Sequence, residues 1–106
     1  MRKPEDCSDM SHIRAEIDRL DQLLVEALTE RSRYIDRAAQ IKSTIAWPAR
    51  IDARVEEVVA NVRRAAEARG LDPALVEDLW RHLIDWSIAR EEKHLGQAAS
   101  PPSAKL

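Results

Sequence analysis

Residues 9–46, DMSHIRAEIDRLDQLLVEALTERSRYIDRAAQIKSTIA, decide the fold of this chain. The stretch contains neither Pro nor Gly, and it is rich in Ala, Leu, Glu and Arg, which favour helix. Its apolar residues recur at spacings of three and four, with an interruption at Arg31, and are Ile13, Ile17, Leu20, Leu24, Ala27, Tyr34, Ala38, Ile41 and Ile45. The pattern predicts one long helix with an apolar stripe along it.

The length of this helix predicts a second copy of the chain. At 1.5 Å per residue the helix would be roughly 55 Å long, whereas a compact domain of about 100 residues has a radius of gyration near 13 Å. Two shorter helices of the same chain cannot cover such a stripe from end to end. We therefore expect a homodimer, intertwined or side by side.

Proline and glycine divide the rest of the chain. Pro48, Gly70 and Pro73 separate two further helix-favouring stretches, about 50–69 and 73–95, and no stretch alternates with the period of two that is typical of strands. Asp72-Pro73 resembles an N-cap followed by the first helical residue, while Gly70 and Gly96 suit helix C-termini. The sequence predicts an all-α fold of three helices, at about 9–46, 50–69 and 73–95.

This pattern places one helical domain at 9–96, between an N-terminal segment, 1–8, and a tail, 97–106, that we expect to be disordered. The chain has 106 residues, 17 Lys or Arg and 19 Asp or Glu, and a net charge of −2, which argues against a nucleic-acid partner. No apolar run approaches the roughly 20 residues that span a bilayer, and the N-terminus lacks the apolar core of a signal peptide. These features predict a cytoplasmic protein with no membrane contact.

Metal and cofactor chemistry have no sequence signature here. The single cysteine and three histidines show no metal-ligand spacing. There is also no Gly-rich phosphate loop and no nucleophile motif. We therefore expect no metal and no cofactor.

Two cations of the long helix lack an acidic neighbour along it. Neither Arg31 nor Lys42 has a carboxylate three or four residues away, where helical ion pairs form. Eleven residues separate them, which places them within about 20° of one face and some 16 Å apart. They hold an anionic ligand between them, or each pairs with a carboxylate of another helix; the sequence leaves both interpretations open.

Glu91 is a carboxyl group on the apolar stripe predicted for the third helix, one turn after Ser87. Desolvation favours the neutral form of such a group, which would then donate a hydrogen bond. The alternative is that Glu91 pairs with Arg31 or Lys42 in the core. Arg14 and Arg54 are less unusual, because Asp18 and Glu57 are available to them as ordinary surface partners.

In this order, these residues resemble the all-helical chorismate mutases and the related isochorismate–pyruvate lyases. The resemblance covers roughly residues 3–95. It rests on the opening Lys3-Pro4-Glu5-Asp6-Cys7, Ile13-Arg14, Ile17-Asp18-Arg19-Leu20-Asp21, Glu30-Arg31, Lys42, Arg54, Gly70-Leu71-Asp72 and the Ser87 to Glu91 spacing.

The resemblance implies a homodimer with two equivalent sites, each lined by both chains, that take a small dianionic substrate, chorismate or isochorismate. By position, Arg31 and the partner subunit's Arg14 would hold the two substrate carboxylates, and Arg54 would add to that grip. Ser87 would line the pocket. Lys42 and a neutral Glu91 would donate to the ether oxygen of the breaking C–O bond, so the catalytic set would be Lys42, Glu91 and Arg31.

The sequence departs from the mutase pattern in two places. Val55 follows Arg54 where mutases often carry an acidic residue, and the Lys3–Cys7 opening is also similar to the lyases, whereas Ser87 is the mutase-like residue. We favour chorismate mutase, the rearrangement of chorismate to prephenate. The alternative is an isochorismate–pyruvate lyase that forms salicylate and pyruvate, and a second is a non-catalytic helical dimerisation or regulatory module.

Overall fold

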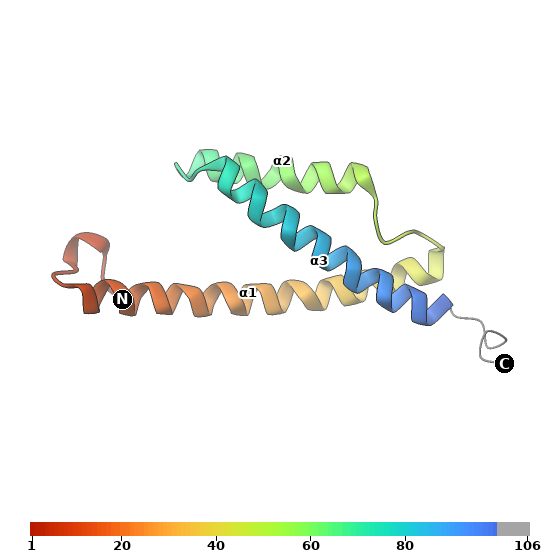
Figure 1. Ribbon diagram of the computed structural model, residues 1–106, viewed down its shortest axis with the longest axis horizontal. Helices are drawn as coiled ribbons and strands as arrows, with labels where there is room; N and C mark the ends of the chain where they lie inside the picture. The colour runs from red at the N-terminus through yellow and green to blue at the C-terminus, as the bar shows by residue number, and fades with distance from the viewer. Residues whose placement is uncertain (100–106) are drawn as a thin grey trace. The chain divides into compact units, whose positions relative to one another are not determined.

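The computed structural model describes residues 1–99, and within them every regular element is helical (Figure 1). A short 3-10 helix, η1 (Pro4–Asp6), precedes α1 (Met10–Ile45), α2 (Asp52–Ala68) and α3 (Pro73–Ala99). The predicted all-α class and the three helices are confirmed. None of the helices within residues 1–99 combines the length and the apolar character needed to cross a bilayer.

Local hydrogen bonds fix most of the helix ends. Asp9 caps α1, because its Oδ1 accepts the backbone N–H of His12 at 3.1 Å, and a further bond from Ser11 helps to lower the pKa of this carboxyl. Asp72 caps α3 as expected, its Oδ1 accepting the N–H of Ala74 at 2.9 Å. Gly70, with φ +72°, takes the left-handed conformation after α2 that its position predicted.

The C-terminal end of α3 was placed wrongly from the sequence. The helix was expected to stop before Gly96, but it continues through Gly96 to Ala99. Glycine is tolerated inside a helix at a modest cost, and the Gln and Ala residues that follow Gly96 favour helix. The part of the predicted tail from 100 to 106 lies outside the described residues.

The chain forms two compact units, of which the first is Met1–Tyr34. It contains η1 and the greater part of α1, and many apolar side chains of its helix are exposed in the single chain. The exposed fractions are 51% for Ile17, 49% for Leu20 and 61% for Leu24. These three residues belong to the predicted stripe, which is therefore open to solvent along this part of α1 in one chain.

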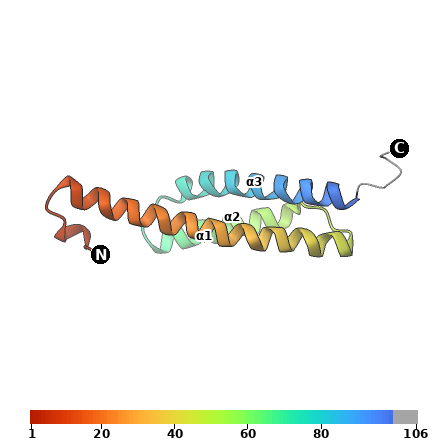
Figure 2. The same ribbon diagram turned by 90° about the horizontal axis from the view of Figure 1, so that it is seen from below.

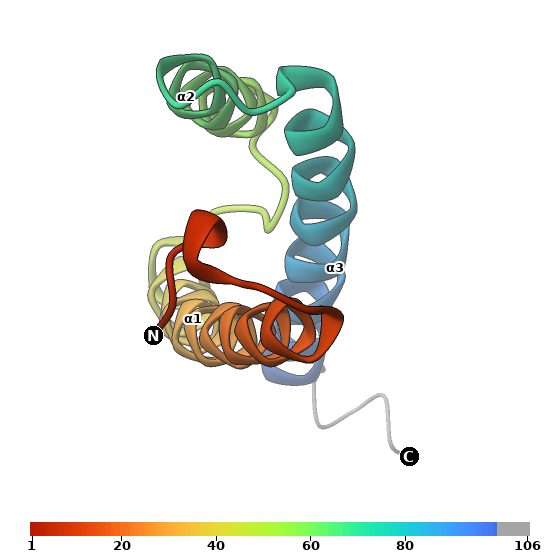
Figure 3. The same cartoon turned by 90° about the vertical axis from the view of Figure 1, so that its left-hand side faces the viewer.

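The second unit begins at Ile35 and contains α2, α3 and the C-terminal end of α1. Helices α2 and α3 run in opposite directions as a hairpin (Figure 2), and an end-on view shows the turn that joins them (Figure 3). Val55, Val59 and Ile84 form the buried apolar cluster between them, with Val58, Trp80 and Ile88 packed around it. This hairpin is the scaffold that carries the C-terminal half of the candidate site.

Candidate active site

Lys42 and Glu91 form a buried ion pair between α1 and α3. Lys42 Nζ lies 2.7 Å from Glu91 Oε1, and the side chains are 16% and 5% exposed. A buried charge is costly unless an opposite charge accompanies it, and each residue provides that charge for the other. Of the alternatives left open by the sequence, the single chain therefore shows the direct pairing of Lys42 with Glu91.

The ion pair leaves hydrogen-bonding capacity at Glu91. Within the described residues, Oε1 is fully buried and has no hydrogen bond of good geometry, although Nζ is close to it. A buried acceptor without a hydrogen bond costs free energy. This oxygen can therefore accept a hydrogen bond from a further group. Glu91 thus provides one electrostatic contact and one unsatisfied polar atom at the same place.

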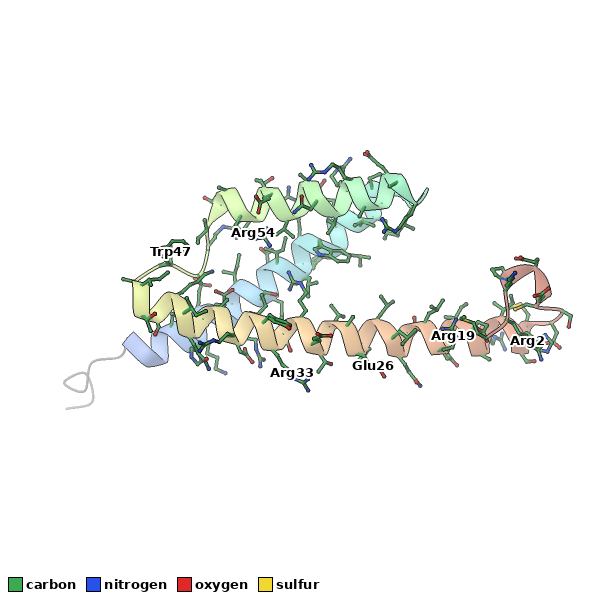
Figure 4. All side chains as sticks on the ribbon, turned by 180° about the vertical axis from the view of Figure 1, so that it is seen from behind. Arg2, Arg19, Glu26, Arg33, Trp47 and Arg54 are labelled. Carbon is green, nitrogen blue, oxygen red and sulfur yellow. The ribbon has the colours of Figure 1, made fainter. Side chains whose placement is uncertain are left out.

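The second partner of Lys42 is the segment between α1 and α2. Lys42 Nζ donates a hydrogen bond of 2.8 Å to the carbonyl oxygen of Ala49, a buried residue. The chain leaves α1 through Ala46, at φ 58°, and the N–H of Trp47 returns to the carbonyl oxygen of Lys42 at 3.0 Å. Figure 4 shows Trp47 in this segment. An ammonium group has three N–H donors; one is used by Ala49 and the charge faces Glu91, so at least one N–H is left for a ligand.

Ser87 lies one turn before Glu91 on α3, as its spacing predicted, and only 3% of it is exposed. Its hydroxyl donates to the carbonyl oxygen of Leu83 at 2.8 Å. Val76, Ile84, Ser87 and Glu91 are all buried, so the inward stripe of α3 changes from apolar to polar near its C-terminal end. This change places a hydroxyl and a carboxyl on one helix face.

The four arginine and lysine residues predicted for the site are divided between the two units. Arg14 and Arg31 are on α1 in the first unit, and Lys42 and Arg54 are in the second with Ser87 and Glu91. Arg54, in the first turn of α2 (Figure 4), pairs with Glu57 and is 63% exposed. That pair is the ordinary surface contact that the sequence offered as the alternative for Arg54.

A second ion pair between α1 and α3 was not found from the sequence. Arg90 donates two hydrogen bonds to Asp36, from Nε to Oδ1 at 2.5 Å and from Nη2 to Oδ2 at 3.0 Å. These bonds lower the pKa of Asp36 and raise that of Arg90. Arg90, like Lys42, has no carboxylate three or four residues away, so the criterion that singled out Lys42 would also have found Arg90.

No group of three or more metal-ligating side chains of the kinds His, Cys, Asp and Glu occurs in residues 1–99. The polar atoms gathered at the site are instead an ammonium group, a carboxyl group and a hydroxyl group. Such a set can bind an anion and donate to, or orient, an oxygen that gains negative charge. Binding and electrostatic stabilisation are therefore the chemistry that the arrangement offers.

Comparison with known proteins identifies the family of the chain. Residues 13–92 match the model of the family described as chorismate mutase type II. The chain is 40% identical over 98 residues to the isochorismate pyruvate lyase of Pseudomonas aeruginosa, an alignment that covers 92% of this chain and 95% of that protein. It is also 29% identical over 84 residues to the T-protein of Enterobacter agglomerans, covering 79% of this chain and 22% of that protein. The chain belongs to the chorismate mutase type II family.

Proposed function

We propose that the protein is an isochorismate–pyruvate lyase, whose substrate is a dicarboxylate of the chorismate type. The observation that carries the proposal is the buried Lys42–Glu91 pair, in which an ammonium N–H and the buried oxygen Oε1 of Glu91 have hydrogen-bonding capacity that the described residues do not use. The relative that covers almost the whole chain bears the name of this lyase. The Lys3–Cys7 opening and Val55 after Arg54, both similar to the lyases, support the same choice over the mutase that the sequence favoured.

For this reaction the protein has to hold the substrate in a reactive conformation more than it has to supply an acid, a base or a nucleophile. A concerted cleavage breaks the C–O bond of the enolpyruvyl ether while a ring hydrogen moves to the methylene carbon, so that salicylate and pyruvate together contain all the atoms of isochorismate. Arg31, Arg54 and the partner subunit's Arg14 are the proposed grip on the two carboxylates. Holding the side chain over the ring converts lost orientational freedom into rate.

The ether oxygen gains negative charge as the C–O bond breaks. The remaining N–H of Lys42 is the proposed donor to this oxygen, and Glu91 is the second donor when it carries a proton. In the single chain Glu91 faces Lys42 as its counter-charge. Ser87, one turn earlier on α3, is the proposed residue of the pocket wall.

Supplying the purified protein with isochorismate and, separately, with chorismate tests the proposal. We expect salicylate and pyruvate in equal amounts from isochorismate, and a loss of about 10²–10³ in kcat for Lys42→Ala. The matched control is Arg33→Ala, which removes an exposed cation of the same helix (Figure 4) and leaves turnover unchanged. Absence of salicylate would refute the lyase proposal.

Chorismate mutase is the second candidate, because Ser87 is the mutase-like residue and is buried beside Glu91 on α3. Prephenate from chorismate, without salicylate from isochorismate, would favour this candidate. Turnover of neither compound, together with no shift of the melting temperature by either dianion, would favour the non-catalytic helical module.

A further inference from the structure

Adjacent residues of α3 each reach α1. Arg90 binds Asp36 through two hydrogen bonds, and Glu91 pairs with Lys42 at 2.7 Å. The first pair is solvent-facing, with Arg90 45% and Asp36 42% exposed, whereas the second is buried. Arg90 and Glu91 are consecutive residues. A contact that holds Arg90 against α1 therefore also holds the backbone of Glu91 in position relative to Lys42.

The solvent-facing pair of Arg90 and Asp36, here called the outer pair, has a defined geometry. A guanidinium group that forms two parallel hydrogen bonds to a carboxylate is held in orientation as well as in distance. The Arg90 guanidinium also lies over the ring of Trp86, one turn earlier on α3, with 5.4 Å between its Cζ and the ring centroid. Trp86 thus restricts the conformers from which Arg90 reaches Asp36.

The buried pair of Lys42 and Glu91, here called the inner pair, is not held in a fixed orientation in this way. Lys42 presents a compact charge on a long stem, and Glu91 Oε1 has no well-aligned hydrogen bond within residues 1–99. The buried apolar cluster Val55, Val59 and Ile84 joins α2 to α3, and it includes no residue of α1. The buried residue of α1 is Ala39, whose methyl group is less directional than a pair of hydrogen bonds, so contacts such as the outer pair contribute to the register between α1 and α3.

We propose that Asp36 and Arg90, with Trp86 beneath the guanidinium, are positioning residues that set the distance and direction between Lys42 and Glu91. They act through Glu91 and touch no substrate. The inference rests on the proposed function for its kinetic consequence, although the positioning itself is independent of which reaction is catalysed. Exposed ion pairs add little to the free energy of unfolding. Removal of the Asp36–Arg90 pair should therefore lower kcat and leave the stability of the fold nearly unchanged.

The kinetic test compares Asp36→Asn and Arg90→Gln with the double variant Asp36→Arg/Arg90→Asp, in which the charges are exchanged. We expect each single variant to lose roughly tenfold in kcat, since misplacement by 1 Å can cost about 10²-fold. The KM and the melting temperature stay near their original values, and the double variant recovers most of kcat. If Arg90 instead acted by its positive charge, the exchange would restore nothing, and that result would overturn the proposal.

A matched control is available on the other side of α3. Arg81 donates two hydrogen bonds to Glu56 of α2, from Nη2 at 3.0 Å and from Nη1 at 3.2 Å, and its exposure of 41% is similar to that of Arg90. Glu56→Gln removes this pair as Asp36→Asn removes the other. We expect unchanged kcat for Glu56→Gln; an equal loss in both variants would mean a general effect of helix packing and would overturn the positioning role.

A spectroscopic readout separates this proposal from the proposed function. The ¹³C signal of the Glu91 carboxyl carbon and the ¹⁵N signal of Lys42 Nζ, assigned with Glu91→Gln and Lys42→Arg, report the inner pair without substrate. We expect Asp36→Asn to shift both signals, the charge-exchanged double variant to return them, and Glu56→Gln to leave them unchanged. This pattern supports the positioning role even if the protein turns over neither compound, whereas unmoved signals in Asp36→Asn refute it.

Discussion

Lys42 Nζ and Glu91 Oε1 are 2.7 Å apart, in a contact where neither side chain is more than about one-sixth exposed. The part of the chain between these two residues includes all of α2 and most of α3. The contact can serve the proposed reaction in two ways. Either Glu91 donates a hydrogen bond to the substrate, or it is a counter-charge that only directs the Lys42 ammonium group.

The rate of Glu91→Gln distinguishes these two roles. If Glu91 is a donor, the variant retains most of kcat/KM, because the amide N–H can donate to the same oxygen. If Glu91 is only the counter-charge of Lys42, the neutral amide removes the charge that directs the ammonium group, and kcat/KM falls. Steady-state rates of the two proteins provide the measurement.

Glu91→Ala is the control, since it removes both the donor and the charge. A rate of Glu91→Gln as low as that of Glu91→Ala would contradict the donor role. It would leave Glu91 as the counter-charge of Lys42.

The sequence predicted the helices well because their ends are determined locally. Asp72, Pro73 and Gly70 act through their own backbone and side-chain geometry, and each has the role that its type indicates. Gly96 shows the limit of this reasoning. Glycine permits a helix to end but does not compel it, and nothing after Gly96 requires the end, so α3 continues to Ala99.

The candidate site was only partly predictable, because its contacts join distant parts of the chain. The lack of a nearby carboxylate correctly singled out Lys42 as a residue with a tertiary partner, and Glu91 was among the candidates. Asp36 has Arg33 within reach on its own helix, so its sequence neighbours gave no reason to expect Arg90, 54 residues away. The contact of Lys42 with the Ala49 carbonyl oxygen is a backbone interaction that side-chain patterns do not encode.

Replacement of Ala46 by Gly should stabilise the protein. Ala46 has φ 58°, a left-handed conformation that costs an L-residue roughly 1–2 kcal/mol. Part of the gain is lost because Gly has more freedom in the unfolded chain, so we expect an increase of about 0.5–1 kcal/mol in the free energy of unfolding. Urea denaturation measures the change.

Ala38→Gly is the matched comparison, since Ala38 lies inside α1. There the same substitution should lower the free energy of unfolding by about 1 kcal/mol. Two losses of equal size would contradict the role assigned to the Ala46 conformation.

The contacts between α2 and α3 should make stability depend on acid pH. Hydrogen bonds from Arg81 and Arg63 lower the pKa of Glu77, and those from Arg81 lower the pKa of Glu56. A carboxyl group whose pKa is lower in the folded than in the unfolded protein stabilises the fold at pH values above the unfolded pKa, which is about 4.3 for Glu. This contribution is lost as the pH falls through the pKa of the folded protein.

We therefore expect Glu77→Gln to lower the melting temperature at pH 7, and the difference from the original protein to vanish once the pH has fallen below the lowered pKa of Glu77. Scanning calorimetry at several pH values measures it, and Glu67→Gln, at an exposed position of α2, provides the control. A difference that is as large at the acidic end as at pH 7 would show that Glu77 acts through packing and not through its charge.

The open apolar stripe of the first unit predicts association of two chains. Leu24 is 61% exposed and lies midway along the stripe, so Leu24→Glu should place a charge in the interface. We expect a mass of about twice 12.1 kDa for the original protein by sedimentation equilibrium, and a single-chain mass for the variant. Gln22→Glu adds the same charge about 200° around the helix, on the opposite face, and should leave the mass unchanged. Equal masses for all three proteins would contradict the predicted interface.

Shared sites make a sharper prediction than association alone. If each site combines Lys42 of one chain with the partner subunit's Arg14, then Arg14→Ala and Lys42→Ala are each inactive by themselves. After the two are unfolded together and refolded, about half of the dimers are mixed, and each mixed dimer contains one intact site of two. Turnover should then recover to about a quarter of the original value. Dimers that form normally but show no recovery on mixing would place Arg14 and Lys42 of the same chain in one site, because only a site built from two chains can be repaired by exchanging them.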